Sequence, residues 1–183
     1  VFAALAMTEP QGGADIENME LLGGKTIKTT ARLDGDVWII NGHKLWPTNT
    51  GGVGQLFGVP CTTRPGSTDP NDFALIFVPA DVKGVTQGGP YEKAGMAADK
   101  NGDLWFEDVR VPAWYRVHGP GKDAQVFKEI IPWGLVASMG FIVGAMMNLY
   151  EVLYEFVSTR TYGNRPLKEN DAVAGIIGRI AGD

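Results

Sequence analysis

The pattern of apolar and polar residues changes near residue 120. Before that point, short runs rich in β-branched and aromatic residues alternate with turns rich in Gly, Pro and Asp, which is typical of strands. After residue 122 the turn residues stop, and a long, mostly apolar stretch follows. The pattern predicts a β domain over residues 1–118 and the beginning of an α-helical domain over residues 119–183.

Two turn dipeptides divide part of the first half into expected strands. Asp34-Gly35 and Asn41-Gly42 each lie between apolar runs. Asn, Asp and Gly tolerate positive φ, so both dipeptides favour the type I′ turns of β-hairpins. Repeated strands with short connections predict an antiparallel barrel or sandwich. Further strands are expected at 55–63, 73–80 and 103–113.

The stretch 123–160 predicts one long helix, in which Pro132 marks a kink or a first turn. Its apolar side extends nearly all the way round, as in a helix buried in a bundle. A second helix is expected from about Asp171. The predicted fold is therefore α+β, an antiparallel β-barrel or sandwich followed by the first helices of an antiparallel helical bundle. Both ends of the sequence fall inside expected elements, so we expect a longer protein.

Composition excludes some functions and favours one compartment. The net charge of −5 disfavours general nucleic-acid binding. The single cysteine, Cys61, cannot form a disulfide within the chain and is expected to be an apolar filler, and no metal site is expected. We expect neither a signal peptide nor an apolar run long enough to span a bilayer. These features predict a cytoplasmic protein or one of an organelle matrix.

Two short segments could carry chemistry. In Thr8-Glu9-Pro10-Gln11-Gly12-Gly13, Pro10 keeps Glu9 extended, and the glycines allow backbone N–H groups to face a ligand such as a pyrophosphate. A structural turn explains this pattern equally well. Trp46, before Pro47-Thr48, could belong to the core or form a flat wall for a ring system. We interpret the remaining acid and imidazole candidates as structural or surface residues: His43, His118, Glu129 and Glu155.

Together, the segments resemble the acyl-CoA dehydrogenase family. They are MTEPQGGAD at 7–15, DGDVWIINGHKLWPTN at 34–49 and DLWFEDVRVP at 103–112. The family's middle domain typically reads T-E-P-x-x-G-S-D, I-N-G-x-K-x-W-I-T-N and F-x-D-V-x-V-P at these places. STRTYGNRPL at 158–167 is similar to the family's next landmark, an Arg shortly before an aromatic-Gly pair. The resemblance covers essentially the whole chain.

The resemblance implies a middle β-barrel domain and the first part of a C-terminal four-helix domain. It also implies non-covalently bound FAD, an acyl-CoA substrate, an electron-transfer flavoprotein as acceptor, and a tetrameric or dimeric homo-oligomer. The resemblance also implies roles for single residues. Met7 and Thr8 match positions that touch the flavin ring, and Gly13 and Ala14 match the turn near the flavin and the acyl-CoA. Trp46, Pro47 and Thr48 match the segment that lines the isoalloxazine, whereas Arg160 and Thr161 match a region that reaches the FAD of a neighbouring subunit.

The sequence departs from the family pattern at several positions. Ala14 replaces the usual Ser, and Pro47 replaces the usual Ile and removes an N–H. Gly134 and Leu135 occupy a stretch where the family often has an Arg that contacts the acyl-CoA and, in some branches, a catalytic Glu. These two residues are the expected substrate contacts on the helix. Counted back from the aromatic-Gly pair, Arg160 is one residue late.

Three functions follow from the resemblance. The first is FAD-dependent α,β-dehydrogenation of an acyl-CoA to the 2-enoyl-CoA, with the electrons leaving to an electron-transfer flavoprotein. The second keeps the fold but is a flavin oxidase or monooxygenase, which the changes at Ala14 and Leu135 favour. The third is a non-catalytic partner subunit of a heteromer. No carboxylate in the chain is assigned as the catalytic base, which most family members carry later in the sequence.

Overall fold

The structure, a computed structural model, describes residues 1–17 and 27–182. It comprises two compact units, Val1–Ile131 and Pro132–Asp183, whose division falls inside the long helix α1. The domain boundary expected after residue 118 stays a prediction, and Asp183 lies outside the described residues. The elements of the first unit are β1 (Ala3–Leu5), β2 (Thr30–Asp34), β3 (Val37–Lys44), β4 (Leu56–Thr62), β5 (Phe73–Pro79), β6 (Val85–Gln87), β7 (Leu104–Pro112) and the start of α1 (Lys122–Thr159), with short 3₁₀ helices at Ala14–Glu17, Pro70–Asp72 and Ala113–Tyr115.

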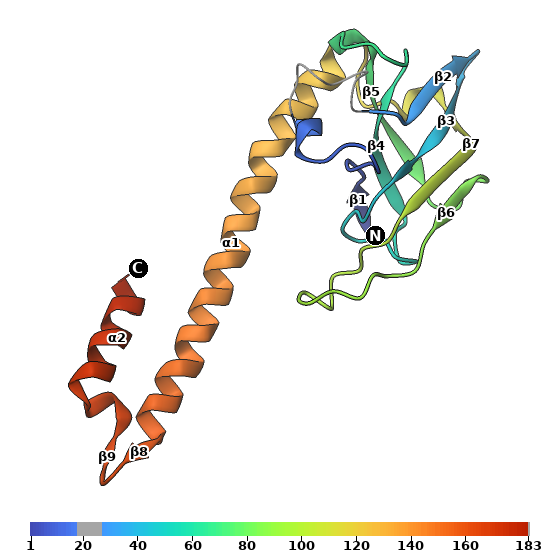
Figure 1. The fold of residues 1–183 in the computed structure, drawn as a ribbon. Coiled ribbons are helices and arrows are strands. Elements are labelled where there is room, and N and C mark those ends of the chain that lie inside the picture. Colours follow the sequence, from blue (N-terminus) through green and yellow to red (C-terminus); the bar gives the residue numbers. More distant parts are fainter. Residues whose placement is uncertain (18–26, 183) are drawn as a thin grey trace. The chain divides into compact units, whose positions relative to one another are not determined.

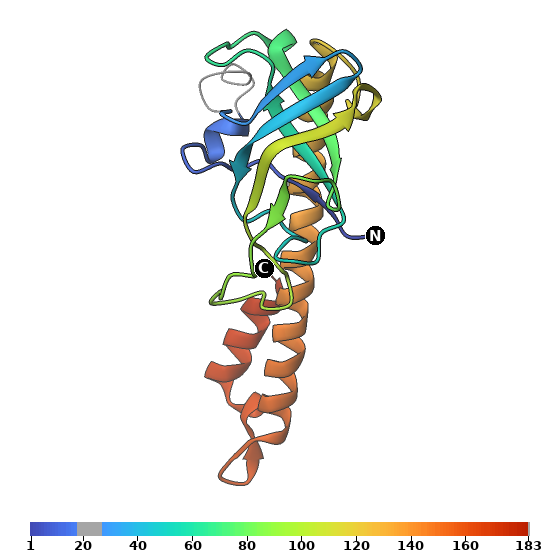
Figure 2. The same ribbon diagram turned by 90° about the vertical axis from the view of Figure 1, so that its right-hand side faces the viewer.

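The strands of the first unit form one curled, mixed sheet. Its order is β1-β4-β2-β3-β7-β6, and β5 pairs with the other edge of β4. Figure 2 shows β2, β3 and β7 side by side in one wall, with β4 and β5 behind them. The expected α+β class is confirmed. The sheet is mixed because β1 and β2 both run parallel to β4, whereas the other pairs are antiparallel.

The two turn dipeptides have different outcomes. Asp34 pairs with Val37 across the β2–β3 hairpin, and Gly35 takes φ 62°, as the turn prediction requires. The hairpin predicted at Asn41-Gly42 is wrong, because β3 continues through both residues and carries a register shift between Ile40 and Gly42. Gly42 instead allows a close approach, since a Cβ there would lie 2.5 Å from Thr29 Oγ1.

Two clusters of buried apolar residues hold the first unit together. The larger fills the inside of the curled sheet and includes Phe57, Ile76 and Cys61. Burial raises the pKa of the Cys61 thiol to about 12, which agrees with its expected part as an apolar filler. In the smaller cluster, Phe127 from the start of α1 packs against Phe73 of β5, with ring centroids 5.3 Å apart.

The second unit contains the rest of α1, the hairpin of β8 (Thr161–Tyr162) and β9 (Arg165–Pro166), a 3₁₀ helix at Leu167–Glu169, and α2 (Asp171–Gly182). The predicted long helix is confirmed to within one residue at each end. Figure 1 shows α2 returning alongside α1, antiparallel to it. The side chain of Asn170 caps α2, because its Oδ1 accepts the N–H of Ala172 at 3.0 Å. Apolar residues of α1 such as Trp133 and Phe141 are exposed within the described residues.

Helix α1 corrects one expectation from the sequence. An 18-residue window of α1 has a mean hydropathy of 1.8, so by length and composition this helix could cross a membrane. Pro132 and several glycines interrupt the apolar stretch, so the sequence analysis did not expect a run of membrane-spanning length. The residues between Glu129 and Glu151 nevertheless carry no charge. Core helices of helical bundles share this length and composition, so the finding assigns no membrane.

Candidate functional site

Two segments of the first unit line a half-open cavity of about 410 Å³. One wall comes from residues 3–8, which include β1 and the residues that follow it. The other wall comes from residues 45–49, which directly follow β3. The cavity therefore brings together the following residues that the sequence assigned to cofactor binding: Met7, Thr8, Trp46, Pro47 and Thr48.

The first wall ends in a tight turn. The N–H of Glu9 donates to the carbonyl of Gly12, and the N–H of Gly12 donates to the carbonyl of Glu9, both at 3.1 Å. The carbonyl of Thr8 accepts the N–H of Leu45 at 2.8 Å, which joins this wall to the other. Thr8 is half-buried, and its hydroxyl has no hydrogen-bond partner among the described residues. That hydroxyl is free to donate to a ligand in the cavity.

The second wall places a half-exposed indole at the cavity. Trp46 is 51% exposed and adopts φ +41°, a backbone conformation that is uncommon outside glycine. The N–H of Trp46 donates to Asp103, and its carbonyl accepts from Asn101 Nδ2 at 3.0 Å. Tyr91 makes an edge contact with the indole, with centroids 6.5 Å apart. These contacts hold Trp46 out of the core of this unit, and its role as a flat wall for a ring system stays a prediction.

Asp103 is the centre of the polar contacts behind Trp46. Its carboxylate accepts from Tyr91 OH at 2.6 Å and from His43 Nε2 at 3.0 Å. Burial alone would raise the pKa of Asp103, but the hydrogen bonds from Tyr91, His43 and the Trp46 N–H outweigh it, so the net pKa is lowered. His43 also stacks on Trp105 at 4.9 Å, in keeping with the structural role expected for it.

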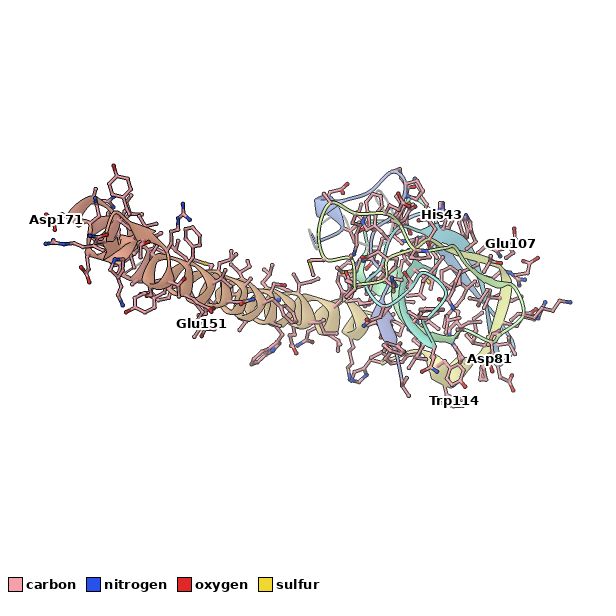
Figure 3. The ribbon with its side chains drawn as sticks, turned by 90° about the horizontal axis from the view of Figure 1, so that it is seen from below. His43, Asp81, Glu107, Trp114, Glu151 and Asp171 are labelled. Carbon is pink, nitrogen blue, oxygen red and sulfur yellow. The ribbon has the colours of Figure 1, made fainter. Side chains whose placement is uncertain are left out.

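The lowered pKa of Asp103 predicts an acid-dependent loss of stability. A carboxyl whose pKa is depressed on folding contributes stability above its unfolded pKa of about 4, and that contribution is lost as pH falls through the folded pKa. We expect Asp103→Asn to lower stability at neutral pH and to flatten its decline at acidic pH. Urea unfolding from pH 7 to pH 3 measures this, with Asp81→Asn at the exposed Asp81 (Figure 3) as control. Parallel curves for Asp103→Asn and wild type would contradict the assignment.

Other predicted site residues are not among those that line this cavity. The N–H of Gly13 donates to Asp15 Oδ1 at 2.8 Å, and Gly13 is exposed. Ala14 begins the 3₁₀ helix Ala14–Glu17, and its side chain lies outside the described part of the chain. Four predicted residues belong to the second unit and are exposed there, and their roles stay predictions: Gly134, Leu135, Arg160 and Thr161.

The sequence interpretation missed a buried ion pair beside the cavity. Glu9 Oε1 accepts from Lys44 Nζ at 2.7 Å, and both side chains are almost completely buried. Burial would raise the pKa of Glu9, but the Lys44 ammonium and the hydrogen bonds to the carboxylate lower it overall. A signal existed in the sequence, because Lys44 shares the inward alternation of Trp38 and Ile40 in a strand. A lysine in that position requires a buried carboxylate partner.

Comparisons with known proteins identify the family of this chain. The model of the middle domain of acyl-CoA dehydrogenases matches residues 4–109, more than half of the chain and the part that contains the cavity. The chain belongs to the acyl-CoA dehydrogenase family.

Relatives in this family extend well beyond the chain. The long-chain specific acyl-CoA dehydrogenase of mouse mitochondria is 34% identical over 157 residues, which are 86% of this chain and 35% of that protein. An acyl-CoA dehydrogenase structure from Geobacillus kaustophilus is 31% identical with TM-score 0.79, covering 98% of this chain and 45% of the other. The prolyl acyl carrier protein oxidase AnaB is 27% identical with TM-score 0.84, again covering 98% and 45%. The chain thus spans less than half the length of each of these three proteins.

The residues that line the cavity fit a flavin, which is the cofactor implied by the resemblance of this chain to the family. The volume falls within the range of small-molecule sites, about 300–1,000 Å³. An exposed indole face and a free hydroxyl suit a flat ring with polar edges, which a purely structural core would not require. Within residues 1–17 and 27–182, no group of three or more His, Cys, Asp or Glu could hold a metal ion.

Proposed function

We propose that the chain supplies the middle-domain part of an FAD-dependent acyl-CoA dehydrogenase. The reaction is the removal of an α-proton and a β-hydride from an acyl-CoA thioester to give the 2-enoyl-CoA. One observation carries the proposal: the two motif segments of the family, one with Thr8 and the other with Trp46, line the same cavity. FAD would supply the hydride acceptor in this reaction.

The residues of the chain would bind, orient and shield rather than exchange protons. Trp46 provides a flat apolar wall, and the Thr8 hydroxyl provides a donor to a ring that gains electron density on reduction. The apolar side chains that line the cavity, Met7 among them, keep water away from the hydride step. Pro47 has no N–H to donate, so binding here relies more on Thr8 and Thr48.

The base that takes the α-proton is proposed to come from outside the described residues. Among those residues, no Asp or Glu lines the cavity. Glu129 and Glu155 are exposed on α1, and Glu129 Oε1 accepts only a 3.3 Å hydrogen bond from Gln125. We further propose that an electron-transfer flavoprotein accepts the electrons. The assembly is proposed to be a homo-oligomer of two or four subunits, located in the bacterial cytoplasm or an organelle matrix.

A second function has its own supporting observation. AnaB, whose name states a prolyl acyl carrier protein oxidase, is similar to this chain over 98% of its length at 27% identity. Gly134 and Leu135, where the family often has an Arg for the acyl-CoA, also favour a different thioester carrier. The alternative is a flavin oxidase that acts on a thioester attached to a carrier protein and passes electrons to oxygen.

An anaerobic titration separates the two functions. The full-length gene product that carries this chain is purified, its visible flavin spectrum is recorded, and acyl-CoA thioesters of increasing length are added without oxygen. The proposed function predicts that one class of acyl-CoA bleaches the flavin band. Bleaching only by a carrier-protein thioester, with rapid reoxidation by oxygen, supports the alternative. A protein without bound flavin overturns both.

Removing the free hydroxyl of the cavity is expected to weaken flavin binding. Thr8→Val keeps the shape of the side chain but removes a hydrogen bond worth about 0.5–1.5 kcal/mol, so FAD affinity is expected to fall about 2- to 10-fold. Fluorescence titration of the apoprotein with FAD measures this change. Thr86→Val, at an exposed threonine of β6, is the control. Equal affinities for wild type and Thr8→Val would exclude this hydroxyl from the flavin contacts.

A further inference from the structure

The buried ion pair of Glu9 and Lys44 lies next to both walls of the cavity, but neither residue lines it. Glu9 directly follows Thr8 of the first wall, and Lys44 directly precedes Leu45 of the second. Moving two charges out of water is costly, and a well-packed apolar pair would often stabilise a protein as well or better. Stability alone therefore gives a poor account of why an ion pair stands here.

The hydrogen bonds of the pair reach three separate segments. Glu9 Oε1 accepts from Lys44 Nζ at 2.7 Å, and also from the N–H and the hydroxyl of Thr29 at 3.0 and 2.6 Å. Glu9 Oε2 accepts from the N–H of Lys28 at 2.6 Å and from Gln11 Nε2 at 2.5 Å. One carboxylate thus fixes the turn after the first wall, the residues that enter β2, and the last residue of β3.

Lys44 completes the connection between the two walls. Its ammonium donates to the carbonyl of Met7 at 3.3 Å, and the N–H of the next residue, Leu45, donates to the carbonyl of Thr8 at 2.8 Å. The consecutive residues Lys44 and Leu45 therefore bond the consecutive residues Met7 and Thr8 of the first wall. The two bonds set the register of Met7 and Thr8 against the residues that lead into Trp46.

We propose that Glu9 and Lys44 are a positioning pair for the flavin site. Acting through the Met7 carbonyl and the Thr8–Leu45 hydrogen bond, the pair holds the two walls at the spacing that a flat ring needs between Thr8 and Trp46. This inference rests on the proposed function, since it takes the ligand of the cavity to be FAD. Neither side chain is assigned a contact with the flavin or with the substrate.

The test uses two single variants and one double variant to separate an effect on FAD binding from an effect on stability. Glu9→Gln leaves a buried ammonium without its counter-ion, Lys44→Met leaves a buried carboxylate, and the double variant is neutral again. We expect both single variants to lose thermal stability and FAD affinity. The double variant is expected to recover most of the thermal midpoint while still binding FAD about 10-fold more weakly than wild type, with an altered visible spectrum.

The full-length protein is used for each measurement: thermal unfolding, FAD titration of the apoprotein, and the spectrum of the bound flavin. A double variant with wild-type FAD affinity and spectrum would overturn the positioning role and leave the proposed function intact. Wild-type protein that binds no FAD would overturn the proposed function, and this inference with it.

A milder variant decides the matter if the charge-changing variants do not fold. Thr29→Val removes one donor to Glu9 Oε1 and is expected to weaken FAD binding about 3-fold, as the loss of part of a hydrogen-bond network would. Thr63→Val is the matched control, because the Thr63 hydroxyl bonds the carbonyl of Asp72 instead. Equal FAD affinities for Thr29→Val and Thr63→Val would overturn the proposal.

Discussion

Replacing Glu9 with Ala is expected to lower the free energy of unfolding by about 3–5 kcal/mol. The substitution leaves the Lys44 ammonium, which has no exposed surface, without a counter-ion. It also leaves the backbone N–H groups of Lys28 and Thr29 without the acceptor that they share. Urea unfolding of the full-length protein, followed by tryptophan fluorescence, measures the change.

The control for this loss is a carboxylate on the surface of the same sheet. Glu107 of β7 is exposed (Figure 3), so Glu107→Ala is expected to change stability by less than about 0.5 kcal/mol. Glu9→Ala with an equally small effect would mean that Lys44 loses its proton or reaches water at little cost. The ion pair would then not be what holds residues 28–29 and Lys44 against the turn at Glu9.

Gly42→Ala is expected to cost about 3 kcal/mol, although it adds a single methyl group. A Cβ at this position would lie 2.5 Å from Thr29 Oγ1 and 2.7 Å from Thr29 Cα. The backbone of Thr29 cannot move away easily, because its N–H and hydroxyl are bonded to Glu9. The substitution should therefore disturb the Glu9–Lys44 contacts as well, and FAD affinity should fall together with stability.

Gly89→Ala is the matched control, since a Cβ there has no neighbour within 4 Å. It is expected to change the urea midpoint little. Equal midpoints for Gly42→Ala and Gly89→Ala would show that Thr29 yields to the methyl group, and that the close approach of β3 to this residue is not needed for the site.

Gly42 also shows where local sequence signals stop being sufficient. Asp34-Gly35 and Asn41-Gly42 carry the same turn preference, yet only the first forms a hairpin. At the second, Asn41 bonds Asp108 of β7, with Asn41 Nδ2 donating to Asp108 Oδ1 at 3.0 Å, and β3 continues along that strand. A partner 67 residues away decides the conformation, and a dipeptide rule carries no information about it.

The same reasoning separates what could be predicted of the site from what could not. The long helix and the strand runs follow from periodicity, and the motif resemblance placed Thr8 and Trp46 in one site, which the cavity brings together. The exposure of the Trp46 indole depends on Asp103 and Asn101, which lie more than 50 residues later in the sequence. Their hydrogen bonds to the Trp46 backbone hold that residue in an uncommon conformation with positive φ. The Glu9–Lys44 pair likewise joins residues 35 apart, so the sequence does not show that these two charges are partners.

A crystal structure of the full-length protein with FAD tests the central claim most directly. The account predicts that the isoalloxazine lies in the cavity between the two walls, with its flat face against Trp46 and a polar edge within hydrogen-bond distance of the Thr8 hydroxyl. A flavin bound elsewhere, with this cavity filled by protein side chains or by solvent alone, would contradict it.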